Sequence, residues 1–336
     1  MKEQLRKGVR NNNSPKKATK QIKLVKQNRY PEIVGLGAII MLGITIYSNS
    51  FDCSFHFDDI LRIVDNIKIR NIADVEAWWN YYPSRPLGMF SFVLNYHFNQ
   101  LNVWYYHFVN LIIHLIYSCL VWWLTLLIFL SPALKENPII RQKKTIAFLT
   151  ALMFVSHPLA TQSVTYIVQR LASMMAMFYL CSLILYMKAR LSDKGSISKI
   201  LLYSGSMVSA IFAMLTKENA FALPIAIILF EFFFLRTKKI SIVFSDYRFI
   251  LLISILFGII VMVAIKLSSG IFKSVPPMNG HAYILTPINY LFTQFSVIVK
   301  YIQLLFLPIN QKLDYDFPVS NSFFEIGTLL SFVVLL

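Results

Sequence analysis

Residues 102–130 read NVWYYHFVNLIIHLIYSCLVWWLTLLIFL and contain no Asp, Glu, Lys or Arg. A helix needs about 20 consecutive apolar residues to cross a bilayer, so this stretch predicts a membrane-spanning helix. Within it, His107, Asn110 and His114 recur at helical spacing and give the helix one polar stripe. We expect this stripe to face the interior of a helix bundle. For His114 we favour a hydrogen bond to a neighbouring helix over a chemical role.

Apolar segments recur along the chain, in which hydrophobic residues make up 57% and charged residues only 14%. They cover residues 31–50, 145–156, 171–187, 200–215, 220–235, 249–267, 288–307 and 323–336. Because lipid leaves backbone polar groups unsatisfied in any other open structure, these segments predict helices. We therefore expect an all-α fold, a polytopic transmembrane helix bundle of about eight or nine spans. Segment 288–307 contains Gln294 and Lys300, so it either crosses the membrane, lies in the interface or is re-entrant.

The basic residues predict how this bundle is oriented. Residues 1–30 hold ten Lys or Arg and one acid, which is typical of a disordered cytosolic tail. The loops 131–144, 188–199 and 236–248 each hold four more, so 22 of the 32 basic residues fall on one side if every segment crosses. The positive-inside rule assigns that side to the cytosol. We expect residues 31–336 to form the membrane domain, with a first span that is retained rather than cleaved as a signal peptide.

The loop of residues 52–101 falls on the opposite, exoplasmic side and carries six of the 16 acidic residues. Two of them, Asp58 and Asp59, are adjacent and lie at the membrane surface, where an ionisable group is a functional candidate. Partial burial raises a carboxyl pKa toward neutral pH, which suits a general base that takes a proton from an acceptor hydroxyl. We predict a catalytic carboxylate in this pair. An ordinary helix cap or a solvated loop is the structural alternative.

Other polar residues on the same side are candidates for binding a substrate. Arg85 precedes a proline that fixes the local backbone, and its guanidinium fork suits a phosphate. Lys217 and Glu218 place a cation and an anion between two apolar segments, and we expect Arg170 to pair with Glu218. Solvated turns and contacts with lipid headgroups are the structural alternative. The predicted substrate-binding residues are Arg85, His107, His157, Arg170, Lys217 and Glu218.

Several classes of site are missing from the sequence. It has no Gly-rich phosphate loop, no His-Glu-x-x-His, no Gly-x-Ser-x-Gly and no Cys pair at zinc spacing. The basic residues stand in short blocks between apolar runs, which excludes nucleic acid as a partner despite the net charge of +16. A divalent cation, Mg²⁺ or Mn²⁺, stays open as a cofactor, because a pair of Asp residues without further ligands is weak support for a metal.

Seven short motifs occur in an order known from one family. They are Phe57-Asp58-Asp59, Arg85-Pro86-Leu87, Tyr106-His107-Phe108-Val109-Asn110 with His114, His157-Pro158 with Gln169-Arg170, Thr216-Lys217-Glu218, Phe292-Thr293-Gln294 and Leu313-Asp314-Tyr315-Asp316. Over about residues 47–315 the chain resembles the membrane portion of the transmembrane and tetratricopeptide-repeat O-mannosyltransferases, which are GT-C glycosyltransferases. The resemblance implies an enzyme that moves a sugar from a polyprenyl-phosphate carrier to a protein or glycan acceptor at the non-cytosolic face. The family's essential acid maps onto Asp58 and Asp59.

The chain departs from the eukaryotic family pattern in two ways. After His157-Pro158 it has Ala160 and Gln162 where those relatives tend to have His and Glu, and the helical-repeat tail is absent. We therefore expect a bacterial relative in the inner membrane, with a periplasmic active site. The sequence stops at Leu336 inside an apolar run, so we expect a fragment or a shortened relative of a longer protein.

The resemblance also gives the basic candidates a role. We expect Arg85, Arg170 and Lys217 to form a positive surface for the donor phosphate, because they share one face. Two other classes stay open. A transporter or flippase of a lipid-linked or anionic substrate also places charges between helices, but its site lies near the midplane. A non-catalytic membrane scaffold is the other class, although a scaffold does not need a cluster of acids with an arginine.

Overall fold

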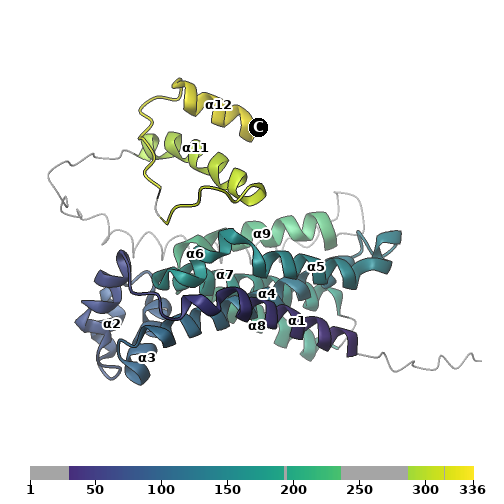
Figure 1. Ribbon diagram of the computed structural model, residues 1–336. Helices are drawn as coiled ribbons and strands as arrows, with labels where there is room; N and C mark the ends of the chain where they lie inside the picture. Colours follow the sequence, from purple (N-terminus) through teal and green to yellow (C-terminus); the bar gives the residue numbers. More distant parts are fainter. Residues whose placement is uncertain (1–29, 193–194, 236–286, 314) are drawn as a thin grey trace, which may run out of the picture.

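A computed structural model of the chain describes residues 30–192, 195–235, 287–313 and 315–336 (Figure 1). Within these residues all regular structure is helical, as the expected all-α class requires. Four features of the sequence analysis lie outside the described residues: the tail up to residue 29, the basic segment 236–248, the expected span 249–267 and the loop 268–286.

The bundle consists of helices that run side by side in Figure 1 and contact one another in pairs. These helices are α1 (Tyr30–Tyr47), α4 (Val103–Phe129), α5 (Lys143–Ser156), α7 (Arg170–Leu191), α8 (Ser196–Met214) and α9 (Leu223–Phe230). Five stretches of the described chain are long and apolar enough to cross a membrane: Glu32–Ser50, Val103–Phe129, Ile167–Leu191, Ser196–Met214 and Glu218–Leu235. They confirm the spans expected at residues 31–50, 102–130, 171–187, 200–215 and 220–235. The chain is an integral membrane protein.

The remaining apolar segments differ from their expected form. The segment expected to span at 145–156 belongs to a bent pair, Pro138–Ser156 and Pro158–Thr165, whose parts meet at 50° and make either one broken span or a re-entrant loop. Segment 288–307 forms α11 (Pro287–Phe306), which is amphipathic and is not among the spans found in the described residues. The last segment forms only the ten-residue α12 (Ile326–Leu335). Within the described residues five or six spans are present, fewer than the expected eight or nine.

Contacts between the helices define two ends of the bundle. At one end, Lys144 Nζ pairs with Glu32 Oε1 at 2.9 Å and Ala133 N–H donates to the Phe234 carbonyl at 3.3 Å. The starts of α1 and α5 therefore meet at this end, and the loop after α4 contacts the segment Glu231–Leu235 that follows α9. We call it the basic end. At the other end, Leu87 N–H donates to the Leu215 carbonyl at 3.0 Å and joins the 52–101 loop to the end of α8. We call it the loop end. The helices therefore run alternately from the basic end to the loop end and back, as expected if each segment crosses the membrane.

The 52–101 loop folds into a small helical cap at the loop end. Its helices are α2 (Val75–Tyr81) and α3 (Pro86–Asn99), and both begin at ordinary signals. Asp74 Oδ1 accepts from Ala77 N–H at 3.0 Å and caps α2, whereas α3 starts on Pro86, which needs no hydrogen-bond partner for its nitrogen. An apolar core holds the cap against the bundle, formed by Ile63, Ile69, Trp78, Met89, Phe92, Val93, Tyr106, Ile167, Val168 and Leu171.

The polar stripe of α4 faces the bundle interior, as expected. His107, Asn110 and His114 are all at most 1% exposed. His114 Nε2 lies 3.2 Å from the Val155 carbonyl of α5, and its ring contacts Phe154 at 5.5 Å between centroids. This hydrogen bond between helices confirms the structural interpretation of His114.

Candidate functional site

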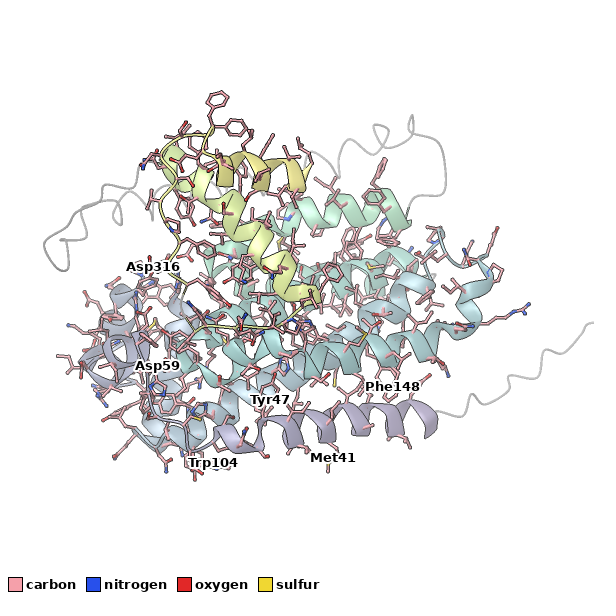
Figure 2. The ribbon with its side chains drawn as sticks, turned by 45° about the horizontal axis from the view of Figure 1, so that its top comes forward. Met41, Tyr47, Asp59, Trp104, Phe148 and Asp316 are labelled. Carbon is pink, nitrogen blue, oxygen red and sulfur yellow. The ribbon has the colours of Figure 1, made fainter. Side chains whose placement is uncertain are left out.

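The aspartate pair lies at the loop end, and its two members differ in their surroundings. Figure 2 shows Asp59 at this end of the molecule. Asp316, from the segment that follows α11, lies at the same end. Asp59 is 1% exposed, and its two carboxylate oxygens accept from two separate segments. Its Oδ2 accepts from His56 N–H at 3.1 Å and its Oδ1 from Val168 N–H at 2.7 Å. Asp59 therefore ties the cap to the turn that precedes α7.

Burial raises the pKa of Asp59. Desolvation disfavours the charged carboxylate and raises its pKa above the ordinary value, although the hydrogen bonds from His56 and Val168 act in the opposite direction. A carboxylate with both oxygens engaged by backbone N–H groups has no free lone pair aimed at solvent. Its arrangement suits a structural clamp better than a base that meets an acceptor.

Asp58 is the exposed member of the pair. Its backbone N–H donates to the Tyr166 hydroxyl at 3.1 Å, whereas its carboxylate makes no hydrogen bond within the described part of the chain. Phe57, just before it, has φ 47°, in the left-handed region that costs a bulky residue conformational energy. Tyr166 and Asp59 thus fix the backbone of Asp58 on both sides while its carboxylate stays free to meet a substrate.

Arg170 lies inside the bundle, with none of its surface exposed. Its guanidinium donates to three oxygens: Asn110 Oδ1 at 2.6 Å from Nε, the Ser91 carbonyl at 3.3 Å from Nη1 and the Tyr106 carbonyl at 2.9 Å from Nη2. The rings of Phe92 and Tyr106 lie 4.7 and 5.6 Å from its Cζ. We call Arg170, Asn110 and Asp59 the interior node. This geometry corrects the role expected for Arg170, which has no surface to offer a phosphate.

Glu218 pairs with Arg85, so the expectation that it pairs with Arg170 was wrong. Arg85 Nε lies 3.1 and 3.0 Å from the two Glu218 oxygens, and Nη2 lies 2.9 Å from Oε2. Ser84 Oγ adds a third donor at 2.6 Å. Arg170 could not compete, because the hydrogen bonds inside the bundle already use its donors. The side chains of Arg85 and Glu218 remain 22% and 38% exposed, so the pair lies at the rim of the loop end.

Lys217 completes this rim cluster, which we define as Ser84, Arg85, Lys217 and Glu218. The side chain is half-buried, and its amino group has no hydrogen-bond or ion-pair partner among the described residues. Burial, and then the charge of Arg85, lower the pKa of Lys217, whereas Glu218 raises it. An unpaired cation beside an arginine is an unfavourable arrangement, which an incoming anion would relieve.

The two predicted histidines serve as connectors. His157 Nδ1 accepts from Leu159 N–H at 3.2 Å, so a neutral ring carries its proton on Nε2, which lies 3.0 Å from the Leu305 carbonyl. His157 thereby joins the bend after α5 to the end of α11. His107 is 1% exposed, and its Nε2 lies 2.9 Å from the Cys53 carbonyl. It holds the start of the acidic loop against α4.

Five of the predicted site residues fall into two groups, whereas Asp58, His107 and His157 lie outside both. The interior node contains Arg170 and Asp59, whereas Arg85, Lys217 and Glu218 form the rim cluster. Ser84 and Tyr166 were not among the predicted site residues. Ser84 stands next to Arg85, but its partner is 134 positions away, and no spacing in the sequence signals that contact. Within the described residues, no group of three His, Cys, Asp or Glu could hold a metal ion.

Comparison with known proteins adds to this geometry. The chain is 30% identical over 215 residues to Protein O-mannosyl-transferase Tmtc3 of Drosophila melanogaster, a match of 56% of this chain and 23% of that protein. It is 27% identical over 217 residues to Protein O-mannosyl-transferase TMTC2 of Homo sapiens, covering 60% of this chain and 24% of that protein. The chain is a relative of these protein O-mannosyl-transferases.

The relationship to the O-mannosyl-transferases is confined to part of their length. The chain spans about a quarter or less of the length of the curated relatives it matches. No family model matches the chain. No solved structure matches it either.

Proposed function

We propose that this O-mannosyl-transferase relative is a membrane glycosyltransferase of the GT-C type. It transfers a sugar from a polyprenyl-phosphate donor to the hydroxyl of a protein or glycan acceptor, at the face where the 52–101 loop lies. That face is the periplasmic side of the inner membrane if the protein is bacterial. The names of the relatives, protein O-mannosyl-transferases, support the transferase class. Eight or nine spans remain the expected total for the whole bundle.

One observation carries the proposal for the chemistry. The same end of the bundle holds a carboxylate, Asp58, and a cation, Lys217, whose charged groups have no hydrogen-bond or ion-pair partner among the described residues. Transfer of a sugar needs both groups, because a proton leaves the acceptor hydroxyl as a negative charge develops on the departing phosphate.

In the proposed reaction Asp58 acts as the general base. The acceptor oxygen loses its proton to the Asp58 carboxylate and forms a bond to the anomeric carbon of the sugar. The bond between that carbon and the phosphate oxygen breaks, and its electron pair leaves with the polyprenyl phosphate. Lys217, with Arg85 behind it, stabilises the resulting charge. Asp59 and Arg170 position Asp58 and do not touch the substrates. A divalent cation at Asp58 remains a further prediction.

Transfer from a radiolabelled donor tests this function. The full chain is reconstituted in nanodiscs with polyprenyl-phosphate [¹⁴C]mannose and a Ser/Thr-rich peptide, and label on the peptide and released polyprenyl phosphate are measured. Asp58→Asn removes the base and should lower turnover by roughly 10²–10⁴. Asp65→Asn, the same change at an exposed position of the same loop, is the matched control. Intact donor that crosses a proteoliposome membrane would indicate a transporter. A chain that neither transfers the sugar nor moves the donor would be a scaffold.

A native cysteine tests the face of the site. Cys53 is exposed in the acidic loop, whereas Cys119 and Cys181 lie within spanning helices and are only partly exposed. A membrane-impermeant maleimide added to intact cells should label the wild-type chain, and Cys53→Ser should abolish that labelling. Labelling only after permeabilisation would place the loop in the cytosol and overturn the proposed orientation.

A further inference from the structure

A groove lies between α1 and α4, away from the catalytic candidates. Its volume is about 460 Å³, which falls in the usual range of ligand pockets, about 300–1,000 Å³. Along α4 its lining runs from Ile112 to Leu126, a distance of about 21 Å at the rise of an α-helix. Along α1 the lining runs from Ile40 to Glu32. The groove therefore occupies the half of the bundle next to the basic end and opens there.

The groove walls favour a flexible chain over a packed helix. They consist of large aliphatic and aromatic side chains, and Cys119 is the smallest residue among them. Helices that associate in membranes need small residues at the contact so that their backbones can approach. On α1, Gly35 is already used inside the bundle, since a Cβ there would lie 2.4 Å from Trp122 Cη2, and Gly37, which has open space around it, does not line the groove. A hydrocarbon chain, which adapts to the walls, fits this site better.

The mouth of the groove carries a positive charge. Glu32 lines the groove, but Lys144 neutralises it through the 2.9 Å ion pair. Lys188 adds an exposed cation whose Nζ lies 4.8 Å from the centre of the Trp123 ring, and Trp123 itself lines the groove. Trp123 is 37% exposed, and its indole N–H has no acceptor in the part of the chain that the structure describes. A cation and a free N–H beside an apolar groove suit an anionic headgroup joined to a hydrocarbon chain.

We propose that this groove binds one anionic phospholipid from the leaflet at the basic end. One acyl chain lies between α1 and α4, the phosphate contacts Lys188, and Trp123 donates to the phosphate or to an ester carbonyl. The site is separate from the proposed sugar transfer at the loop end, so it holds whether or not the chain is an enzyme.

Native mass spectrometry of the full chain in mild detergent tests the site. The probes are phosphatidylglycerol and phosphatidylcholine with identical acyl chains, which differ in headgroup charge. The wild-type chain should retain one phosphatidylglycerol with a preference of about tenfold over phosphatidylcholine, the size expected of one charge-assisted contact. Lys188→Gln should abolish this preference and leave phosphatidylcholine binding unchanged. Lys135→Gln, the same change at an exposed position of the basic end, should keep the preference.

A second variant tests the groove itself. Ile116 lines the groove and is 46% exposed, so the chain should tolerate a larger side chain there. Ile116→Trp should lower retention of both lipids at least tenfold while gel filtration shows an unchanged monodisperse protein. If Lys135→Gln and Lys188→Gln lose the preference for phosphatidylglycerol equally, the preference comes from the general surface charge and not from a site at Lys188. Unchanged lipid retention in Ile116→Trp, or a second copy of the chain in place of lipid, would overturn the proposal.

Discussion

The interior node and the rim cluster both centre on an arginine at the loop end, yet they satisfy it in different ways. Arg170 is fully buried, and three protein oxygens accept from its guanidinium without a directly bonded carboxylate. Arg85 is partly exposed and binds a carboxylate, while a second cation, Lys217, lies near it with no partner in the part of the chain that the structure describes. The first arrangement is complete, whereas the second has room for an anion.

This difference separates structural from functional candidates better than residue type does. A buried polar group whose nitrogen or oxygen atoms all have partners stabilises one arrangement of the chain, and removing it leaves those partners unsatisfied. A half-buried charge without a partner raises the free energy of the protein until a ligand arrives, and such groups concentrate at functional sites. The same contrast holds between Asp59, with both oxygens engaged, and Asp58, whose carboxylate accepts no hydrogen bond from the described residues.

Arg170→Met should have the largest effect on stability. It removes the donor for Asn110 and for two backbone carbonyls inside the bundle, and each buried acceptor that is left without a partner costs about 1–3 kcal/mol. Thermal unfolding in detergent measures the loss. Arg85→Met is the matched control and should cost about 1 kcal/mol or less, since its ion pair with Glu218 is partly exposed. Equal losses in the two variants would erase the distinction between node and rim.

Asp59→Asn should have the next largest effect. A carboxamide has one acceptor oxygen, so its NH₂ group would face the N–H of either His56 or Val168, and one buried donor would lose its acceptor. We expect a loss of about 1–3 kcal/mol in the free energy of unfolding. Asp58→Asn, one position away, should leave the melting temperature unchanged while it lowers turnover. If Asp59→Asn melts like the wild type and Asp58→Asn does not, the two roles are reversed.

Much of this arrangement could be predicted from local properties of the sequence. Hydropathy predicted the spans around α1, α4, α7, α8 and α9, because a spanning helix is a property of one continuous segment. The spacing of His107, Asn110 and His114 predicted a buried stripe for the same reason. Charge and position predicted that the 52–101 loop and the turn at residues 216–219 would lie at the same end of the bundle, and the hydrogen bond between Leu87 and Leu215 joins them there. Hydropathy and helical spacing are properties of a single continuous segment, and the side on which a loop lies follows from the order of the segments.

The pairings could not be predicted, because they join distant segments. Arg85 and Glu218 are 133 positions apart, and the sequence made Arg170 an equally reasonable partner. The choice follows from burial: Arg170 lies between α3 and α4, where carbonyl oxygens take its donors. The division of work between Asp58 and Asp59 was hidden for a similar reason, since it depends on Val168, 109 positions away.

Lys217→Gln tests whether the rim cluster binds the donor phosphate. Removing a charge-assisted contact to the donor phosphate should raise the donor KM about tenfold, and kcat should fall as well, because the negative charge on that phosphate grows as the sugar leaves. Lys68→Gln, a neutral substitution at an exposed lysine of the cap, should leave both constants unchanged. A donor KM that stays at the wild-type value in Lys217→Gln removes Lys217 from the binding site.

The smallest effect concerns the pH dependence of stability at Lys217. Burial and Arg85 lower its pKa in the folded protein, so the unfolded chain, with a lysine pKa of about 10.4, binds more protons over the interval between the two values. Stability should therefore rise as pH increases through the lowered pKa and level off above the ordinary one. The gain should stay under about 1 kcal/mol, because solvent screens a half-buried charge. Melting temperatures of wild type and Lys217→Met, compared at intervals from pH 7 to 10.5, isolate this contribution from other groups that titrate there. The variant should melt at a higher temperature than the wild type near neutral pH, and this difference should shrink as pH rises. A difference that grows with pH would mean that the charged lysine has a partner. The rim cluster would then be as complete as the interior node.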